Sequence, residues 1–241
     1  LDSVTFLNEN RGLVMGDPID RRLFLLHSND SGWTWAQVPN TPELEVGEAG
    51  FAASGTNMTT LGTDRWAIAL GGDLPADKPD GADSKIESEH RPSHREPRYS
   101  RIITVDSKLQ DWRISTTPLR RHESGGVFSL VFLDSKRGIA VGGDYQQPEL
   151  AQDHLAVTSD GGETWTVPDS THQPSGFRSG VAVGKSDAGA RQLIAVGTNG
   201  TDLSLDLGQT WQRVSETGFN AVQFSPDGRT GWAAGSNGRI A

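Results

Sequence analysis

Three aspartates recur at one kind of position in the chain, directly after a short apolar run that ends in glycine: Asp17, Asp73 and Asp144. Brought together in a ring, such carboxylates would bind a cation or the hydroxyl groups of a sugar. An aspartate repeated at the start of a loop can equally form an Asx turn, in which the side chain accepts a backbone N–H bond two residues on. The spacing leaves both interpretations open, and the turn is the favoured one.

Tyr145 and Arg178 are the strongest individual candidates for contact with a ligand, and Arg120 is a further candidate. Arginine offers a planar fork of donors suited to a carboxylate. Tyrosine adds an aromatic surface with a polar tip, and both residue types are enriched at recognition sites. We expect alanine at Tyr145 or Arg178 to weaken binding by about 1–2 kcal/mol or more, without a comparable loss of stability. The alternative for each polar residue of this group is that it caps a loop or solvates the surface.

One octapeptide with the pattern S/T-x-D-x-G-x-T-W occurs three times, at residues 28–35, 158–165 and 204–211. Its chemistry is that of a tight hairpin, because the aspartate accepts backbone N–H bonds and the glycine adopts a left-handed conformation. The threonine suits the returning strand, and the tryptophan has a large apolar face for packing between sheets. We therefore expect structural roles for the aspartates and tryptophans of this Asp box: Asp30, Trp35, Asp160, Trp165, Asp206 and Trp211.

A fourth, eroded copy runs from Thr104 to Trp112; it lacks the glycine and has one extra residue. With its aspartate at position 106, the four aspartates are 76, 54 and 46 residues apart. A polar insertion at about 73–100 accounts for the excess in the first interval, so the period is that of a four-stranded propeller blade. Short apolar runs that end in glycine follow the same period, at 12–16, 66–71, 138–142, 193–197 and 231–235.

These repeats predict an all-β fold, a β-propeller of four-stranded antiparallel blades with Asp-box hairpins, in a single domain over residues 1–241. Each blade is expected to run strand A, turn, strand B, loop, strand C, Asp-box turn, strand D. Four blades are predicted to be complete, and part of a fifth follows them. The four span about 1–40, 50–117, 126–168 and 176–215.

The connections of such a blade separate onto two faces. The A–B turns and Asp-box turns share one face, and the B–C loops and D–A connections share the other. The long loops all belong to the second set: 38–56, 71–100, 116–128, 142–154 and 167–180. Binding groups concentrate on the long loops of a rigid scaffold. We therefore expect the functional site on this long-loop face, away from the Asp boxes.

Over nearly its whole length the chain resembles the bacterial Asp-box (BNR) propeller group. That group includes photosystem II stability/assembly factor-like proteins and is often called sialidase-like or glycosyl hydrolase-like. The resemblance is carried by the three boxes and by residues 16–18, 50–56, 141–145 and 174–178. It implies a seven-bladed propeller with about two blades before Leu1, in an extracytoplasmic (periplasmic or secreted) protein.

The same resemblance implies a non-catalytic module that binds a protein partner or assembles a complex, and the alternative is a secreted carbohydrate-active propeller with a glycan ligand. Sialidases of this kind use an arginine triad, a tyrosine nucleophile paired with a glutamate, and an aspartate acid/base. This chain has two tyrosines, Tyr99 in the insertion and Tyr145, and no Arg-Ile-Pro element. Catalysis stays open at this point, with binding as the favoured role.

Composition narrows the class of partner. The chain has 31 acidic and 22 basic residues, and its formal charge of −9 repels nucleic-acid phosphates. No apolar run approaches the ~20 residues that span a membrane, and there is no cysteine. His90 and His94 have a spacing that could bind a metal on a helix, but Pro92 between them favours a solvated loop. We expect no metal and no cofactor, and the sequence leaves the oligomeric state open.

Overall fold

The computed structural model describes residues 1–73, 96–168 and 172–241. In this part the chain consists of antiparallel strands and one short 3-10 helix, η1 (Ser236–Gly238). The strands form five sheets, which we call blades 1 to 5 in chain order. Blade 1 contains β1 (Ser3–Phe6), β2 (Gly12–Ile19), β3 (Arg22–Ser28) and β4 (Ala36–Gln37). Blade 2 contains β5 (Met58–Leu61), β6 (Arg65–Ala69), β7 (Arg98–Asp106) and β8 (Trp112–Arg121).

Blade 3 contains β9 (Gly125–Phe132), β10 (Gly138–Asp144) and β11 (Leu155–Thr158). Blade 4 contains β12 (Gly180–Lys185), β13 (Arg191–Gly197), β14 (Gly200–Ser204) and β15 (Gln212–Ser215), and blade 5 contains β16 (Ala221–Phe224) and β17 (Gly231–Ala234). The strands of each four-stranded blade pair in chain order, as predicted. Blade 3 completes its edge with a short bridge, in which Val157 and Thr166 exchange backbone hydrogen bonds of 2.8 and 2.9 Å.

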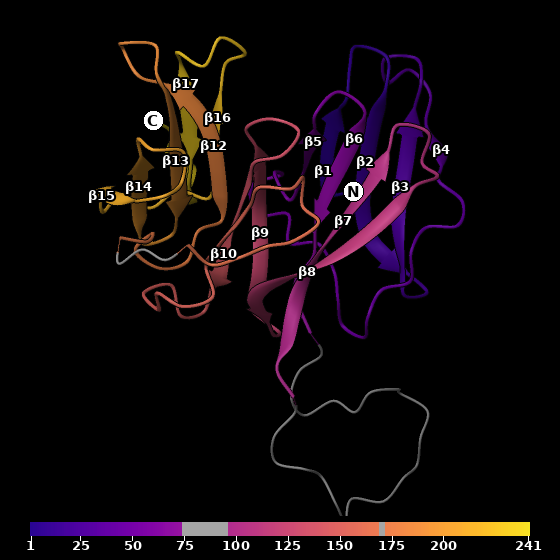
Figure 1. The fold of residues 1–241 in the computed structure, drawn as a ribbon, viewed down its shortest axis with the longest axis horizontal. Helices are drawn as coiled ribbons and strands as arrows, with labels where there is room; N and C mark the ends of the chain where they lie inside the picture. The colour runs from indigo at the N-terminus through magenta and orange to yellow at the C-terminus, as the bar shows by residue number, and fades with distance from the viewer. Residues whose placement is uncertain (74–95, 169–171) are drawn as a thin grey trace, which may run out of the picture.

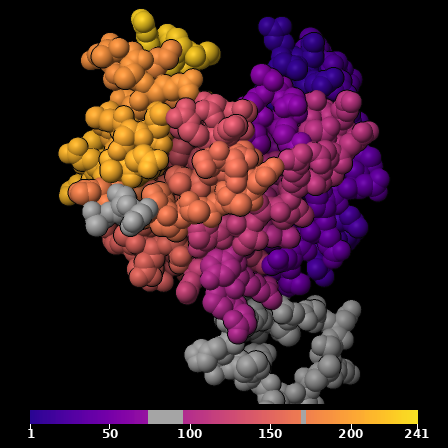
Figure 2. Space-filling model, viewed as in Figure 1, coloured from indigo at the N-terminus to yellow at the C-terminus, as the bar shows by residue number. Residues whose placement is uncertain are grey.

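The first strand of each blade lies against the first strand of the next, from β1 through β5, β9 and β12 to β16 (Figure 1). These strands line an axial cavity of about 500 Å³, with Val4, Thr56, Leu130, Val181 and Gln223 among its wall residues. In the space-filling view blade 1 and blade 5 lie on opposite sides of the molecule, with blade 3 between them (Figure 2). The radial arrangement of antiparallel blades confirms the predicted all-β propeller fold.

In blades 2 and 3 the second strand is buried on both of its faces. In β10, Ile139 and Val141 pack toward blade 4, whereas Ala140 packs toward blade 2. In β6, Trp66 and Ile68 pack toward blade 1. Successive side chains of a strand point to opposite faces, so a strand between two neighbouring blades needs an apolar residue at every position. This explains the uninterrupted apolar runs in the sequence.

Two of the three Asp-box tryptophans pack against the preceding blade. Trp165 is buried between blades 2 and 3, and its Nε1 donates a hydrogen bond of 3.2 Å to Ser115 Oγ of blade 2. Trp211 is buried between blades 3 and 4. Trp35 is only half-buried and meets Phe6 of its own blade edge-on, at 6.0 Å between ring centroids. The expectation of interface packing holds for two of the three, because no earlier blade covers Trp35 within the described residues.

Candidate binding site on the long-loop face

The Asp-box turns lie beside the A–B turns, which fixes the two faces of the molecule. Gly161 N–H in a box donates to Lys136 O in the adjacent A–B turn at 2.8 Å, and Ser31 N–H donates to Asn10 O at 3.0 Å. The loops after the second strands leave from the opposite ends of the blades. The face assignment made from the sequence therefore describes the structure, and we keep the name long-loop face for the side away from the boxes.

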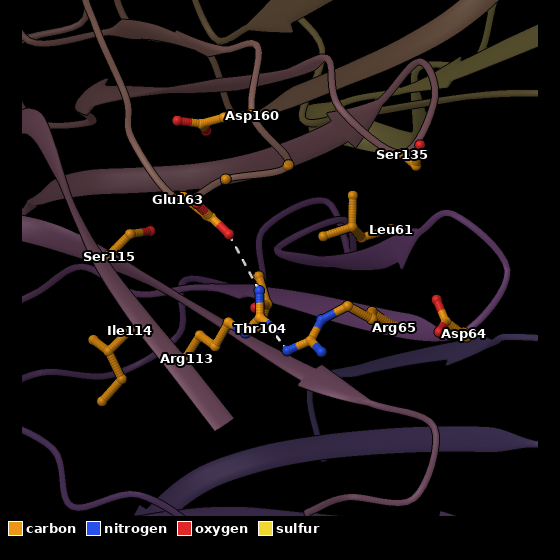
Figure 3. Close-up of a pocket in the computed structure, with 12 residues that line it drawn as sticks. Leu61, Asp64, Arg65, Thr104, Arg113, Ile114, Ser115, Ser135, Asp160 and Glu163 are labelled. Atoms are coloured by element: carbon orange, nitrogen blue, oxygen red, sulfur yellow. Dashed lines mark hydrogen bonds and ion pairs between the residues drawn. The ribbon is translucent and has the colours of Figure 1, made fainter. Parts of the chain in front are cut away.

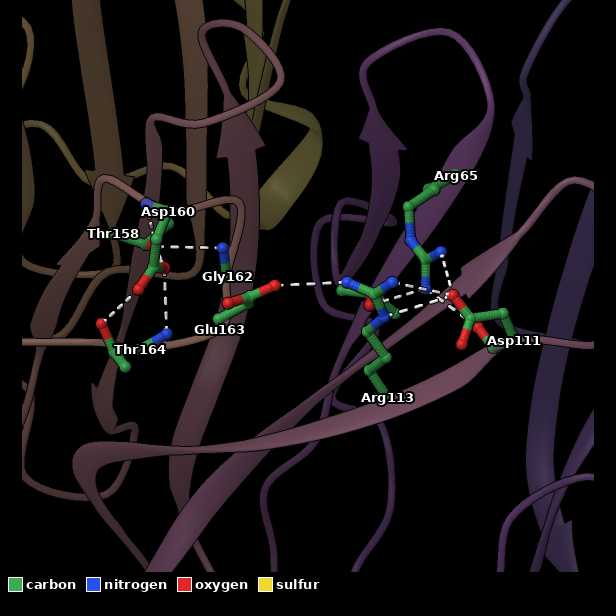
Figure 4. A network of polar contacts seen from close by, with 9 residues as sticks. Arg65, Asp111, Arg113, Thr158, Asp160, Gly162, Glu163 and Thr164 are labelled. Atoms are coloured by element: carbon green, nitrogen blue, oxygen red, sulfur yellow. Dashed lines mark hydrogen bonds and ion pairs between the residues drawn. The ribbon is translucent and has the colours of Figure 1, made fainter.

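The Asp boxes are hydrogen-bonded hairpins, and Figure 4 shows the one that contains Asp160. Asp160 accepts bonds from Thr164 N–H at 2.9 Å, Thr164 Oγ1 at 2.6 Å and Thr158 Oγ1 at 2.8 Å. Hydrogen bonds from Thr164 lower the pKa of Asp160 to about 2. Gly161 and Gly162 both have positive φ, 81° and 84°. The other two boxes repeat the carboxylate contacts, so the box aspartates serve the turn.

Four aromatic rings form one cluster on the long-loop side, near the axis. The rings of Phe51 and Phe128 are stacked, with 4.2 Å between centroids and 1° between planes. Tyr145 meets both of them edge-on, and Phe177 meets Phe128 edge-on at 4.8 Å. Phe128 and Phe177 are buried, whereas Tyr145 is 45% exposed. Tyr145 thus presents an aromatic surface to solvent on a support contributed by three different segments of chain.

A pocket of about 560 Å³ has Asp144 in its wall, and none of the four rings of the cluster lines it. The Asp144 carboxylate accepts hydrogen bonds from Ser124 Oγ at 2.7 Å, Gln146 N–H at 2.9 Å and Gln147 Nε2 at 3.1 Å. His122 Nε2 is 3.9 Å away. Burial acts to raise the pKa of Asp144, but the hydrogen bonds from Ser124 and Gln146 outweigh it and the pKa is lowered. The pocket therefore contains an ionised, buried carboxylate.

The bond to Gln146 N–H is the Asx turn that the sequence favoured. Of the other two aspartates at that kind of position, Asp73 lines the same pocket and accepts a 2.8 Å bond from Arg98 Nη1. Asp17 does not join them. It lies within β2, exposed, with no hydrogen bond or ion pair to the described residues. The described chain contains no group of three or more histidine, aspartate or glutamate side chains placed to hold a metal.

Arg178 is completely buried, contrary to the expectation that it meets a ligand directly. Its Nε donates to Asp202 Oδ2 at 2.6 Å, and its Nη1 donates to Phe177 O and Asn199 Oδ1, each at 2.6 Å. Its Nη2 donates to Ser175 Oγ at 2.8 Å and is paired with Asp202. All five N–H donors of a guanidinium are thus used inside the fold. Arg178 holds the loops of blade 4 together beneath the face.

Arg120 is exposed on β8, where its Nε lies 3.9 Å from Asp153 Oδ2. It does not line the pocket around Asp144. The histidine pair at positions 90 and 94, together with most of the polar insertion, lies outside the described residues. Of the candidates named from the sequence, Asp144 is buried in the wall of the pocket, and its chain neighbour Tyr145 is exposed in the aromatic cluster and does not line that pocket.

Sequence reasoning did not single out the residues that support these two side chains. Ser124 and His122 come from the β8–β9 turn, and their contact with Asp144 depends on how β9 pairs with β10. A signal for the rings did exist, because Phe51 and Phe177 lie within the segments 50–56 and 174–178 that carry the family resemblance. No spacing rule connects two phenylalanines so far apart in the chain.

A second pocket, of about 450 Å³, lies on the opposite, turn-bearing face between blades 2 and 3 (Figure 3). Arg65 Nη1 donates to Asp111 Oδ2 at 2.7 Å, and Arg113 joins that carboxylate to Glu163 of blade 3 at 3.2 Å (Figure 4). Asp111 is supplied by the eroded Asp box. These four charges neutralise one another, so we interpret the network as a link between blades.

Comparison with known proteins supports the fold and leaves the ligand open. No protein-family model and no curated protein sequence matches the chain. A solved structure of YCF48 bound to D1 peptide is similar, with a TM-score of 0.52 and 17% identity over 99% of this chain and 61% of that one. The K499G mutant of NanB sialidase from Streptococcus pneumoniae is also similar, with a TM-score of 0.55 and 11% identity over 99% of this chain and 59% of that one.

A third similar structure is an ancestral GH74 enzyme, with a TM-score of 0.55 and 13% identity over 99% of this chain and 29% of that one. The chain therefore spans less than two thirds of the length of each of these structures. At such identities the likeness shows the propeller fold and no activity. No helix in the described residues is long and apolar enough to cross a membrane.

Proposed function

We propose that this chain is a non-catalytic binding or assembly module, and that a partner protein docks on its long-loop face around Tyr145 and Asp144. The observation that carries the proposal is the half-exposed Tyr145 ring on its aromatic support. Rigid tyrosines are typical anchors of protein interfaces, since they bury much area at a low cost in conformational entropy. The likeness to a propeller solved with a bound peptide supports the same role.

The arrangement of the arginines favours binding over sialidase chemistry. A substrate carboxylate needs arginine forks that point into a pocket. Here Arg178 pairs with Asp202, Arg101 with Glu48 and Arg98 with Asp73. Each of these arginines is directed at a carboxylate of the protein itself.

Site-specific crosslinking tests the proposal. A photoreactive phenylalanine derivative replaces Tyr145 in one variant and Trp33, which is 87% exposed in an Asp box, in the control. After irradiation in an extract of the source organism, we expect one partner protein to crosslink at position 145 and not at position 33. Wild-type protein should compete for it, and Tyr145→Ala should compete poorly. The same set of proteins at both positions would contradict the proposal.

A fluorogenic sialoside tests the alternative. Turnover of the sialoside by the wild-type protein that Tyr145→Phe abolishes would identify a sialidase, because phenylalanine keeps the ring contacts and removes the hydroxyl. We expect no turnover by either protein.

A further inference from the structure

Three carboxylates are buried in the described part of the chain, and they differ in their partners. Asp202 receives Arg178 Nε at 2.6 Å, and Glu48 receives Arg101 Nε at 2.8 Å. The third is Asp144, which has no arginine or lysine against it among the described residues. Removing a charge from water is costly unless an opposite charge replaces the lost hydration. Asp144 is therefore the buried carboxylate for which the described part of the chain supplies no permanent counter-ion.

The groups around Asp144 are neutral hydrogen-bond donors and one histidine. Ser124, Gln146 and Gln147 donate to the carboxylate but carry no charge. His122 is 3.9 Å away and is charged only when it is protonated. The His122 ring is about half exposed, and its Nδ1 lies 3.3 Å from Ser124 Oγ.

Among the described residues, the wall of the pocket next to Asp144 has no arginine or lysine without a carboxylate partner. Arg98 is paired with Asp73, and Arg121 donates to Gly72 O and pairs with Glu45. Two further acids of the pocket, Glu96 and Glu123, are exposed at its rim. Its volume of about 560 Å³ is within the usual range for a ligand site.

We propose that this pocket receives the ammonium or guanidinium group of a lysine or arginine side chain of the partner protein, with Asp144 as the counter-ion. The inference rests on the proposed function and adds the chemistry of the residue that is recognised. A charge-assisted hydrogen bond to a buried carboxylate is strong. Tyr145 is the next residue in the chain but does not line the pocket, so the proposed recognition depends on the charge of Asp144.

An NMR titration tests the charge requirement. The probes are N-acetyl-arginine methylamide and its neutral isostere N-acetyl-citrulline methylamide, added to the ¹⁵N-labelled chain. We expect the arginine probe to shift the amide resonances of Gln146 and Gln147 in a saturable manner, and the citrulline probe to leave them unchanged. Equal binding of the two probes would overturn the proposal.

Two matched pairs of variants assign the effect to Asp144. Asp144→Asn should weaken binding of the arginine probe by about tenfold or more. Glu123→Gln removes the same charge from the rim and should have little effect on the affinity. His122→Lys places an ammonium group next to Asp144 and should block the probe, whereas His122→Gln should not. The second pair also covers the case in which Asp144→Asn fails to fold. The proposal would be overturned if the two variants of either pair lost the same affinity for the arginine probe, or if neither lost any.

The crosslinking experiment tests the docking function, and the probe titration tests the cation pocket. A partner that crosslinks at position 145, together with no preference for the arginine probe, would retain the docking function and reject the cation pocket. A specific probe site without any crosslinked partner would identify a site for small cationic molecules and reject the docking function.

Discussion

Tyr145 stands edge-on to the ring of Phe128, with 6.3 Å between the ring centroids and 77° between the ring planes. Phe128 is buried, so one side of Tyr145 is held by a fixed neighbour while much of its surface stays in contact with water. A side chain that is already fixed loses little freedom when a partner covers it. This relationship makes Tyr145 suited to anchor an interface, and the first prediction depends on it.

Tyr145→Ala should weaken binding of the crosslinked partner by about 1–2 kcal/mol or more, in the range of interface hot spots. The reason is the loss of a rigid aromatic contact on the long-loop face. Isothermal titration calorimetry with the purified partner measures the change. Trp33→Ala removes a more exposed aromatic side chain from the opposite face and should leave the affinity unchanged. An equal loss of affinity in both variants would contradict a specific role of Tyr145 in the interface.

Arg178→Ala should lower the free energy of unfolding by about 3–5 kcal/mol, because it leaves Asp202 charged and buried without its partner. This replaces the expectation, made from the sequence, that the substitution spares stability. Urea denaturation followed by tryptophan fluorescence gives the value. Arg120→Ala breaks a 3.9 Å exposed contact and should cost less than about 1 kcal/mol. Similar losses in the free energy of unfolding for the two variants would show that the buried Arg178–Asp202 pair stabilises the fold no more than the exposed contact.

Asp160→Ala should destabilise the protein by about 1–3 kcal/mol, because the N–H and hydroxyl donors of the turn lose their acceptor. Ser159→Ala changes an exposed neighbour in the same turn and should be close to neutral. Partner affinity should stay the same in both variants, since the box lies on the turn-bearing face. A selective loss of binding by Asp160→Ala at unchanged stability would contradict the face assignment.

Acid unfolding should report the Asp boxes directly. The pKa of Asp160 in the folded chain is about 2, below the ordinary value of 3.8, and Asp30 has the same shift. A carboxylate with a lowered pKa contributes stability that is fully present above 3.8 and is lost as the pH falls toward 2. We expect the urea midpoint of the wild type to drop across this window, and that of Asp160→Asn to drop less. If the urea midpoints of the two proteins fell by the same amount over this pH range, Asp160 would not be a source of the acid sensitivity.

The architecture could be predicted because its signals are local. The octapeptide encodes a hairpin within eight residues, and the apolar runs reflect burial on both faces of one strand. The three aspartates show where local signals end. Asp17 has the sequence position of Asp144, but β2 continues past it to Ile19, with an irregularity in its pairing between Gly16 and Ile19. Strand length depends on pairing with β3, which no local pattern records.

The site could be predicted only in part, for a similar reason. Arg178 and Tyr145 are alike in the sequence, as conspicuous polar residues in long loops. Their burial differs because Asp202, in β14, reaches the Arg178 guanidinium and nothing comparable reaches Tyr145. A contact across 24 residues between a loop and a strand leaves no periodicity in the chain.

The alternation of side chains in the second strands means that no blade has a core of its own. Ile139 and Ala140 are neighbours in the chain, yet each contributes to a different interface. An engineer who moved one blade into another propeller would carry over two half-interfaces and leave two behind. The modular unit of this molecule is the boundary between sheets, and recombination should succeed where it exchanges matched boundaries.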